Sequence, residues 1–354
     1  MTGKEQLLSQ FSVVELDREV AARGIGDSAA TQSEPDNSEG LHEEESGCAQ
    51  VRKPFRGDVS LYIRPELRRI SNWELAKTLV LNTWDGARGV WFFDGRKDIF
   101  QVDDKQIREN AACVAAVCLE NNLEGEENGY TRLKLKPYGA SVGLSKRERF
   151  YKQPVFAGKI CTGFLVKEDI VATAAHIADE RNVTALRIVF GFTMRNARTP
   201  VTMIPTKDIY RGVEIIKRRY IPKSGEPDWA LVKLDRPVTS RKPAKPSRKK
   251  LYRGQRVYTI GHPRGLPLKA APGANISNFN KHCFVADLDI YSGNSGSPVF
   301  CGDTHKVIGM VVRGDSRDFK KTKQGMVSVV YPDFDILNCG AQNTRISEFI
   351  MYCL

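Results

Sequence analysis

Three short motifs place a serine, a histidine and an aspartate in contexts suited to nucleophilic chemistry. Ser295 stands in SGNSGSPVF, His176 follows an apolar run in TAAHIAD, and Asp228 opens the apolar segment DWALVKLD. A serine hydroxyl attacks well only when a base takes its proton, and histidine is such a base near neutral pH. A buried carboxylate needs a donor, which a histidine N–H supplies. The three residues therefore predict acyl transfer, with Ser295 as nucleophile, His176 as base and Asp228 as its orienting acid.

Each motif alone also has an ordinary structural interpretation. GNSG suits a simple turn, a lone histidine is commonly structural, and an aspartate often begins a strand. The order His, Asp, Ser adds specificity, because it is one of the few chain orders in which these groups form a catalytic set. The other histidines have no matching context of serine motif or buried acid; they are His42, His262, His282 and His305.

After residue 155 the chain consists of short β-rich runs separated by Gly, Pro, Asp and Asn turns, without helical crossovers. This texture predicts an all-β fold, an antiparallel sandwich or barrel. The predicted strands lie within residues 163–176, 183–192, 228–235, 256–263, 283–291, 297–300, 306–314 and 326–332. The run 236–256 carries nine basic residues, three prolines and no acidic residue, so it predicts an exposed loop.

The first third of the chain has a different texture. Residues 25–50 are acidic and poor in large apolar groups, which predicts a flexible linker, and helical spacing predicts helices over 65–84 and 104–120. We therefore expect a flexible, acidic extension and a partly helical segment before the main domain. The expected boundaries are 1–60 for the extension, 61–120 for the helical segment and 121–354 for the main domain, with barrels at about 150–235 and 250–340.

Charge and cysteine usage narrow the setting. The formal net charge is +12 although residues 1–50 are acidic, so the remainder is strongly basic. No segment is long and apolar enough to span a membrane, and the first residues lack the pattern of a secretory signal. The eight cysteines have no paired spacing typical of a metal site. We expect free thiols, a cytoplasmic location, no membrane partner, no metal and no cofactor.

At these motifs the chain resembles bacterial trypsin-like serine peptidases, related to the glutamyl-endopeptidase branch. The likeness is carried by CTGFLV, TAAH, DWALVKLD, IGHPRGLPLK and ADLDIYSGNSGSPVF, and it extends over roughly residues 95–354. It implies a chymotrypsin-like fold of two six-stranded antiparallel β-barrels and a serine endopeptidase acting through an acyl-enzyme. The resemblance also implies an oxyanion hole formed by the backbone N–H groups of Gly293 and Ser295. A substrate pocket would include Asp289, Arg313 and Gly314.

The chain departs from secreted trypsins at three positions. Ile177 replaces the cysteine that would pair with Cys161, so that disulfide is not expected. Asn294 replaces the aspartate that binds a new N-terminus, so activation by N-terminal insertion is not expected. Val312 stands where a serine supports the catalytic aspartate in many relatives, which leaves open how Asp228 is held.

Specificity and partners depend on weaker signals. Asp289, six residues before Ser295, implies a preference for a basic residue before the scissile bond, unless Arg313 neutralises it. The partners expected are a protein or peptide substrate, with one specific intracellular target as an option, and an acidic partner for the 236–256 run. Residues 1–90 are a candidate regulatory or targeting segment. The alternatives are a catalytically inactive trypsin-like binding module and a nucleic-acid-binding protein. The second is disfavoured because Tyr252 is the one aromatic residue of the basic run, and nucleic-acid-binding segments typically interleave several.

Overall fold

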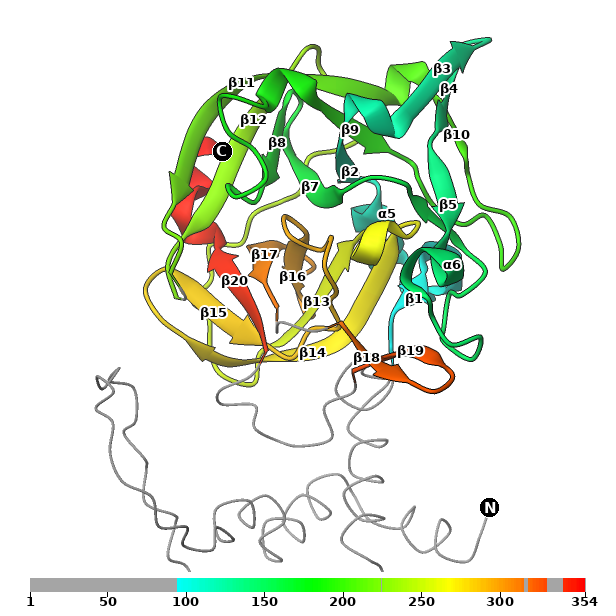
Figure 1. Ribbon diagram of the computed structural model, residues 1–354. Helices are drawn as coiled ribbons and strands as arrows, with labels where there is room; N and C mark the ends of the chain where they lie inside the picture. The colour runs from blue at the N-terminus through cyan, green and yellow to red at the C-terminus, as the bar shows by residue number, and fades with distance from the viewer. Residues whose placement is uncertain (1–93, 224, 315–317, 330–339, 354) are drawn as a thin grey trace, which may run out of the picture. The chain divides into compact units, whose positions relative to one another are not determined.

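The computed structural model describes residues 94–353, except 224, 315–317 and 330–339. The helix expected over 65–84 and the linker of 25–50 lie outside the described residues. Two antiparallel barrels account for most of the described chain, and Figure 1 shows the first in cyan and green and the second in yellow, orange and red. No helix among the described residues is long and apolar enough to cross a membrane.

The first barrel closes in the order β11-β12-β8-β7-β2-β9. Its strands are β2 (Val114–Leu119), β7 (Ile160–Lys167), β8 (Ile170–Thr173), β9 (Leu186–Phe190), β11 (Ile209–Tyr220) and β12 (Asp228–Leu234). Strand β2 lies between β7 and β9 and is buried on both faces up to Cys118. The register places Val171 and Val232 on one face of the barrel sheet and Phe164 and Leu231 on the other, and all four are buried in one apolar cluster.

The second barrel is a sheet in the order β1-β14-β13-β16-β17-β20-β15, which the pairing of β14 with β15 closes. Its six closing strands are β13 (Arg256–Gly261), β14 (Lys269–Phe279), β15 (Cys283–Ala286), β16 (Pro298–Cys301), β17 (Val307–Arg313) and β20 (Ala341–Arg345). The short β1 (Lys97–Asp98) pairs with the outer side of β14. The expected all-β fold of two six-stranded barrels is confirmed.

The remaining elements are short, and they lie before β2, between barrel strands or after β20. They are the helices α5 (Lys105–Ala111) and α6 (Tyr138–Val142), the strands β3 (Leu123–Glu127), β4 (Tyr130–Leu133), β5 (Leu135–Pro137), β6 (Pro154–Phe156), β10 (Met203–Pro205), β18 (Phe319–Thr322) and β19 (Gly325–Ser328), and the 3-10 turns η4 (Ile99–Gln101), η5 (Glu120–Asn122), η6 (Val183–Ala185), η7 (Thr206–Asp208), η8 (Pro263–Gly265), η9 (Ile346–Glu348) and η10 (Ile350–Tyr352).

Two expectations near residue 120 are wrong. The helix expected over 104–120 ends at Ala111, and its second half is the barrel strand β2. The boundary at 121 and the first barrel's start at about 150 are therefore too late, because β2 already belongs to that barrel. A strand buried on both faces has no polar–apolar alternation, so its apolar residues also fit a helical spacing.

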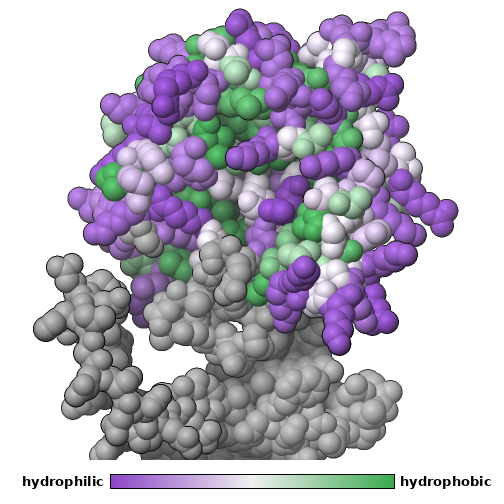
Figure 2. All heavy atoms as spheres, in the orientation of Figure 1, coloured by the Kyte–Doolittle hydropathy of each residue, from purple (hydrophilic) through white to green (hydrophobic). Residues whose placement is uncertain are grey.

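The basic run 236–256 lies between β12 and β13, and most of its residues are at least partly exposed, as expected. Several of its arginines have acidic neighbours: Arg236 pairs with Asp235 at 2.9 Å and Arg256 with Asp303 at 2.8 Å. Hydrophilic residues also cover most of the face that Figure 2 shows. The run is therefore a largely solvent-exposed segment, and carboxylates of the same protein neutralise part of its positive charge.

Candidate active site

The pairing of β8 with β12 brings His176 to Asp228. Ala230 is opposite Thr173, so the end of β8 lies beside the start of β12. His176 follows β8 by three residues and Asp228 is the first residue of β12. The two side chains meet through Nδ1 of His176 and Oδ2 of Asp228, 2.7 Å apart. Because a carboxylate only accepts, Nδ1 carries the hydrogen and Nε2 is left to accept a proton.

Asp228 is fully buried, whereas His176 is 30% exposed. The carboxylate has two further partners: the backbone N–H of His176 donates to Oδ1 over 3.1 Å, and Nη2 of Arg313 lies 3.6 Å from Oδ2. Its own backbone N–H donates to Oγ1 of Thr344 over 3.2 Å. Val312 contributes no hydroxyl, so the arginine that follows it in the sequence compensates the buried charge.

Ser295 lies in the loop between β15 and β16, where two glycines are sterically required. Gly293 has φ of +100°, and a Cβ there would lie 2.6 Å from the backbone oxygen of His262. Gly296 has φ of +89°, and a Cβ would lie 1.9 Å from the backbone oxygen of Thr162. The Gly-Asn-Ser-Gly turn thus fits closely against the first barrel, and only glycine permits that approach.

Thr162 of β7 fixes this loop from the first barrel. Its backbone N–H donates to the carbonyl of Ser295 over 2.9 Å, and its hydroxyl donates to the carbonyl of Gly293 over 2.8 Å. The same hydroxyl accepts the backbone N–H of His262 over 3.0 Å. Sequence reasoning did not identify Thr162, although it lies inside the CTGFLV motif that carries the resemblance.

Two backbone N–H groups beside Ser295, those of Gly293 and Ser295, are the predicted oxyanion donors. The carbonyl of Ser292 accepts the N–H of Arg264 over 2.6 Å. In a trans peptide the next N–H points the opposite way, so the N–H of Gly293 faces away from Arg264. Within the described part of the chain, no hydrogen bond is recorded from the N–H of Gly293 or of Ser295. Both predicted donors are therefore available to a substrate oxygen.

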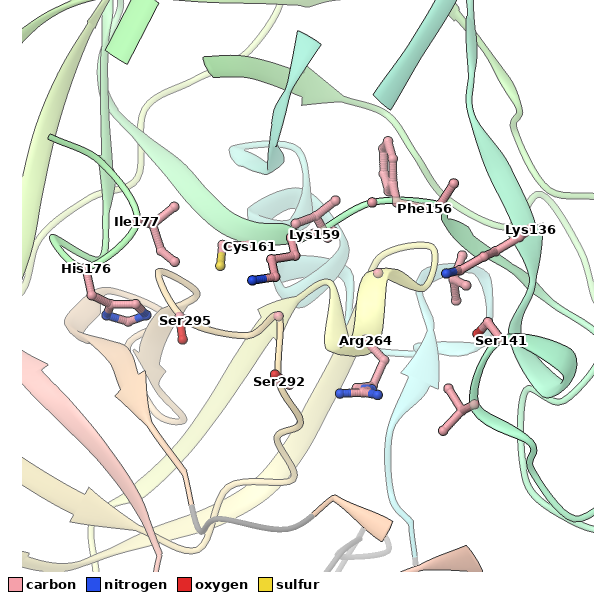
Figure 3. Close-up of a pocket in the computed structure, with 17 residues that line it drawn as sticks. Lys136, Ser141, Phe156, Lys159, Cys161, His176, Ile177, Arg264, Ser292 and Ser295 are labelled. Atoms are coloured by element: carbon pink, nitrogen blue, oxygen red, sulfur yellow. The ribbon is translucent and has the colours of Figure 1, made fainter. Parts of the chain in front are cut away.

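The Ser295 hydroxyl makes one long contact among the described residues, to the carbonyl of Val312 at 3.5 Å. Figure 3 shows it beside the His176 ring, and both residues line one cavity. The structure therefore brings the three predicted residues together, with the His176–Asp228 bond formed and no recorded bond between Ser295 and His176. Such bonds are often long without substrate and shorten in the reacting complex.

Asn294 is held by neutral partners. Its side chain is 2% exposed, its Nδ2 donates to the carbonyl of Tyr291 over 3.2 Å, and its Oδ1 accepts from the hydroxyl of Ser297 over 3.3 Å. An uncharged amide at this position needs no cation to compensate it. The loop therefore has internal support in place of an ammonium group.

Two cavities adjoin Ser295. The larger, of about 650 Å³, is lined by Lys136, Ser141, Val142, Val155, Phe156, Ala157, Gly158, Lys159, Ile160, Cys161, His176, Ile177, Arg264, Gly265, Ser292, Gly293 and Ser295. The smaller, of about 430 Å³, is lined by Val142, Arg264, Ile290, Tyr291, Ser292, Ser295, Val311, Arg313, Gly314, Asp318, Phe319 and Met326. We call them the His176 cavity and the Gly314 pocket.

Two of the three predicted pocket residues, Arg313 and Gly314, line a cavity beside Ser295. Arg313 and Gly314 line the Gly314 pocket, although the guanidinium of Arg313 is also engaged with Asp228. Asp289 does not line either cavity: it is buried, and its Oδ2 accepts the backbone N–H of Gly95 over 3.2 Å. The chain segment before β1 packs against it, and its expected place in the substrate pocket stays a prediction.

The carboxylate that does line the pocket is Asp318. It accepts the backbone N–H of Ser292 and lies 3.3 Å from Nη1 of Arg264. Burial raises the pKa of Asp318, and the charge of Arg264 opposes that shift. Sequence reasoning did not identify Asp318, because it lies after β17 in a segment without a motif.

The cysteine next to the site is unpaired. Cys161 and Ile177 both line the His176 cavity, so the absent disulfide would have lain there. Burial, with a further contribution from the charge of Asp228, raises the pKa of the Cys161 thiol to about 12. The six cysteines within the described residues are free, as expected.

Comparison with known proteins shows similarity to trypsin-like peptidases. Residues 161–310 match the family model described as a trypsin-like peptidase domain, which confirms the resemblance to trypsin-like peptidases over this region. A trypsin of Sarcophaga bullata is 27% identical over 128 residues, which are 36% of this chain and 44% of that protein. The match thus spans less than half of the relative's length.

Solved structures with the same kind of fold are distant in sequence. A Glu endopeptidase in complex with MPD is 14% identical, with a TM-score of 0.44, and the match covers 74% of this chain and 98% of that one. The scabies mite inactivated protease paralogue S-I1 is 15% identical, with a TM-score of 0.43 and coverage of 72% and 94%.

Proposed function

We propose that this chain is a serine endopeptidase that hydrolyses peptide bonds with Ser295, His176 and Asp228. The observation that carries the proposal is the bond of 2.7 Å between the buried Asp228 and His176, together with the cavity that His176, Ser295 and Gly293 line. The match of residues 161–310 to the trypsin-like peptidase domain supports the same assignment.

The chemistry divides into two acyl transfers. Ser295 Oγ attacks the substrate carbonyl carbon while its proton passes to Nε2 of His176. The C–N bond then breaks, the proton passes from His176 to the leaving nitrogen, and the acyl group remains as an ester on Ser295. Water next gives a proton to Nε2 and its oxygen adds to the ester carbon. Oγ departs and recovers that proton from His176.

Each protein group has a separate task in these steps. The buried Asp228 keeps the hydrogen on Nδ1 and stabilises the imidazolium that forms. The N–H groups of Gly293 and Ser295 donate to the oxyanion, and loss of one such donor typically lowers turnover about 10²- to 10³-fold. No cofactor enters the scheme.

A fluorophosphonate probe tests the proposal, because it reacts with an activated serine hydroxyl. We expect labelling of wild-type chain at Ser295, and cleavage of proteome-derived peptides. Ser295→Ala should lose both, and His176→Ala should lose nearly all of both. A folded wild-type chain that is neither labelled nor able to cleave any peptide would overturn the assignment and favour the inactive binding module.

Three further predictions stay untested. The preference for a basic residue before the scissile bond remains a proposal, and the peptide cleavage above measures it directly. The cytoplasmic location and an acidic partner for the 236–256 run remain proposals. Strongly salt-dependent binding to an acidic polymer, lost when the exposed lysines of that run are neutralised, would support such a partner.

A further inference from the structure

The His176 cavity lies on the leaving-group side of the scissile bond. His176 lines this cavity and does not line the Gly314 pocket, whereas Ser295 lines both. In the proposed mechanism His176 gives its proton to the leaving nitrogen, so that nitrogen must lie on the side of the serine that His176 reaches. The part of the substrate after the scissile bond therefore enters the His176 cavity.

Basic side chains surround this cavity. Lys136 comes from β5, Lys159 from the turn before β7, and Arg264 from η8, and no aspartate or glutamate is among the described residues that line it. In the view of Figure 3, His176 and Ser295 lie at one end, Lys136 lies at the other, and Lys159 and Arg264 lie between. The cavity thus presents cations along its length.

Two of these cations are not neutralised by the protein. Lys136 and Lys159 are exposed, and within the described residues neither has an ion-pair partner. Arg264 differs, because Asp318 lies 3.3 Å from it. The two lysines are therefore the groups that a substrate carboxylate would meet, whereas Arg264 contributes a charge that is already compensated.

The end of the cavity nearest Ser295 is less polar. In Figure 3, Ile177 and the neutral thiol of Cys161 lie at this end, beside His176 and Ser295. A side chain directly after the scissile bond therefore meets apolar atoms. An extended peptide advances about 3.3–3.6 Å for each residue, so the following residues come progressively nearer to the lysines.

We propose that the His176 cavity selects polypeptides with acidic side chains at the second and third residues after the scissile bond, bound through Lys136 and Lys159. This inference rests on the proposed function. Exposed ion pairs contribute modestly, so two of them correspond to about a fivefold preference in kcat/KM. The same charges attract an acidic substrate during encounter, and salt weakens both effects.

Quenched fluorescent peptides with one common sequence before the scissile bond test the inference. After the bond they carry Ala-Asp-Asp, Ala-Asn-Asn or Ala-Lys-Lys. For wild-type chain we expect kcat/KM to be about fivefold higher for Asp-Asp than for Asn-Asn, and lower again for Lys-Lys. The preference should shrink towards unity in Lys136→Gln/Lys159→Gln and in about 1 M salt.

The matched control is Lys249→Gln/Lys250→Gln, which removes two exposed lysines of the 236–256 run outside the cavity. This variant should keep the acidic preference. Equal cleavage of the three peptides by wild-type chain would overturn the inference while leaving the peptidase assignment intact. Loss of the preference in the control, with its retention in the cavity variant, would also overturn it.

Binding separates failure of the inference from failure of the proposed function. The Ser295→Ala chain, which cannot form an acyl-enzyme, is titrated with labelled peptides that contain Ala-Asp-Asp or Ala-Asn-Asn, followed by fluorescence anisotropy. Tighter binding of the Asp peptide, lost in Lys136→Gln/Lys159→Gln, supports the cavity's selectivity even if wild-type chain cleaves nothing. Equal binding of both peptides would exclude it.

Discussion

The guanidinium of Arg313 lies 3.6 Å from Oδ2 of Asp228, the oxygen that accepts the hydrogen bond of His176. Arg313 is kept there by two backbone carbonyls, those of Lys223 at 2.7 Å and Ile221 at 3.4 Å. The buried carboxylate is therefore shared between a fixed cation and the histidine that acts as base in the proposed reaction. A cation at this distance compensates the charge of a carboxylate that water does not reach.

Arg313→Met should lower both the free energy of unfolding and kcat. Without the arginine, the buried carboxylate of Asp228 loses the cation that lies 3.6 Å away, and breaking a buried charge pair typically costs about 3 kcal/mol. Arg313→Lys keeps a cation and should lose less of both. Urea unfolding and rates with one peptide between pH 7 and 8 decide this, and a methionine variant as stable and active as wild type would contradict the electrostatic role.

The neighbouring groups do not supply this effect. Arg218 donates to the carbonyls of Ala175 and Ala178 at 3.0 to 3.2 Å, and it stays in place in both variants. Cys161 stays a neutral thiol in this range, because burial and then the charge of Asp228 raise its pKa to about 12. The difference between the methionine and lysine variants therefore isolates the charge of residue 313.

Asn294→Asp should lower both stability and turnover. The new carboxylate would be buried, would face the carbonyl of Tyr291 that now accepts from Nδ2, and would have no cation. Breaking such a buried arrangement costs about 3 kcal/mol. Gly293 and Ser295 flank this residue, so the oxyanion donors would be displaced as well. Urea unfolding and kcat at pH 8 measure the two effects.

The penalty should depend on pH with a defined sign. Burial without a cation raises the carboxyl pKa above its unfolded value of about 3.9, so the loss of stability grows as pH rises above that value. The exposed Asn196 provides the control: its Oδ1 accepts from two backbone N–H groups, and Asn196→Asp can do the same. An Asn294→Asp chain as stable and active as wild type at pH 8 would show that the loop tolerates the charge.

Local sequence was sufficient to predict the strands next to His176 and Asp228, because an apolar run ends just before His176 and another begins just after Asp228. It was insufficient for β2, where VAAVCL is buried on both faces and resembles a helix by spacing. The contacts that hold the buried carboxylates near the site could not be predicted from local sequence for another reason. The contact of Gly95 with Asp289 joins residues 194 positions apart, and that of Arg313 with Asp228 depends on how two barrels meet.

His262 couples the stability of the Ser295 loop to acid. Its side chain is 1% exposed, Nδ1 donates to the carbonyl of Leu266 over 2.9 Å, and the ring stacks on Phe192. Burial lowers the pKa of His262 to about 4, which its bond to Leu266 only partly opposes. Its backbone oxygen lies so near Gly293 that a Cβ there would come within 2.6 Å of it, so a shift of His262 on protonation would disturb the proposed oxyanion donors.

The resulting pH dependence can be measured. The folded pKa lies below the unfolded value of about 6.5, so the contribution of His262 is fully present above pH 6.5 and is lost as pH falls towards 4. The loss amounts to about 1.4 kcal/mol for each pH unit in that window. In His262→Gln, urea unfolding at pH 7 and pH 5 should differ by about 2 kcal/mol less than in wild type.

His305→Gln is the control, because His305 is partly exposed and lies away from the Ser295 loop. It should keep the wild-type difference between pH 7 and pH 5. If His262→Gln does not fold, NMR titration of the wild-type imidazole gives the same information. A midpoint near 6.5 for His262, or an unchanged pH dependence of stability in its variant, would contradict the role of this histidine. Only an imidazole that burial keeps neutral in the folded chain makes stability fall between pH 6.5 and 4.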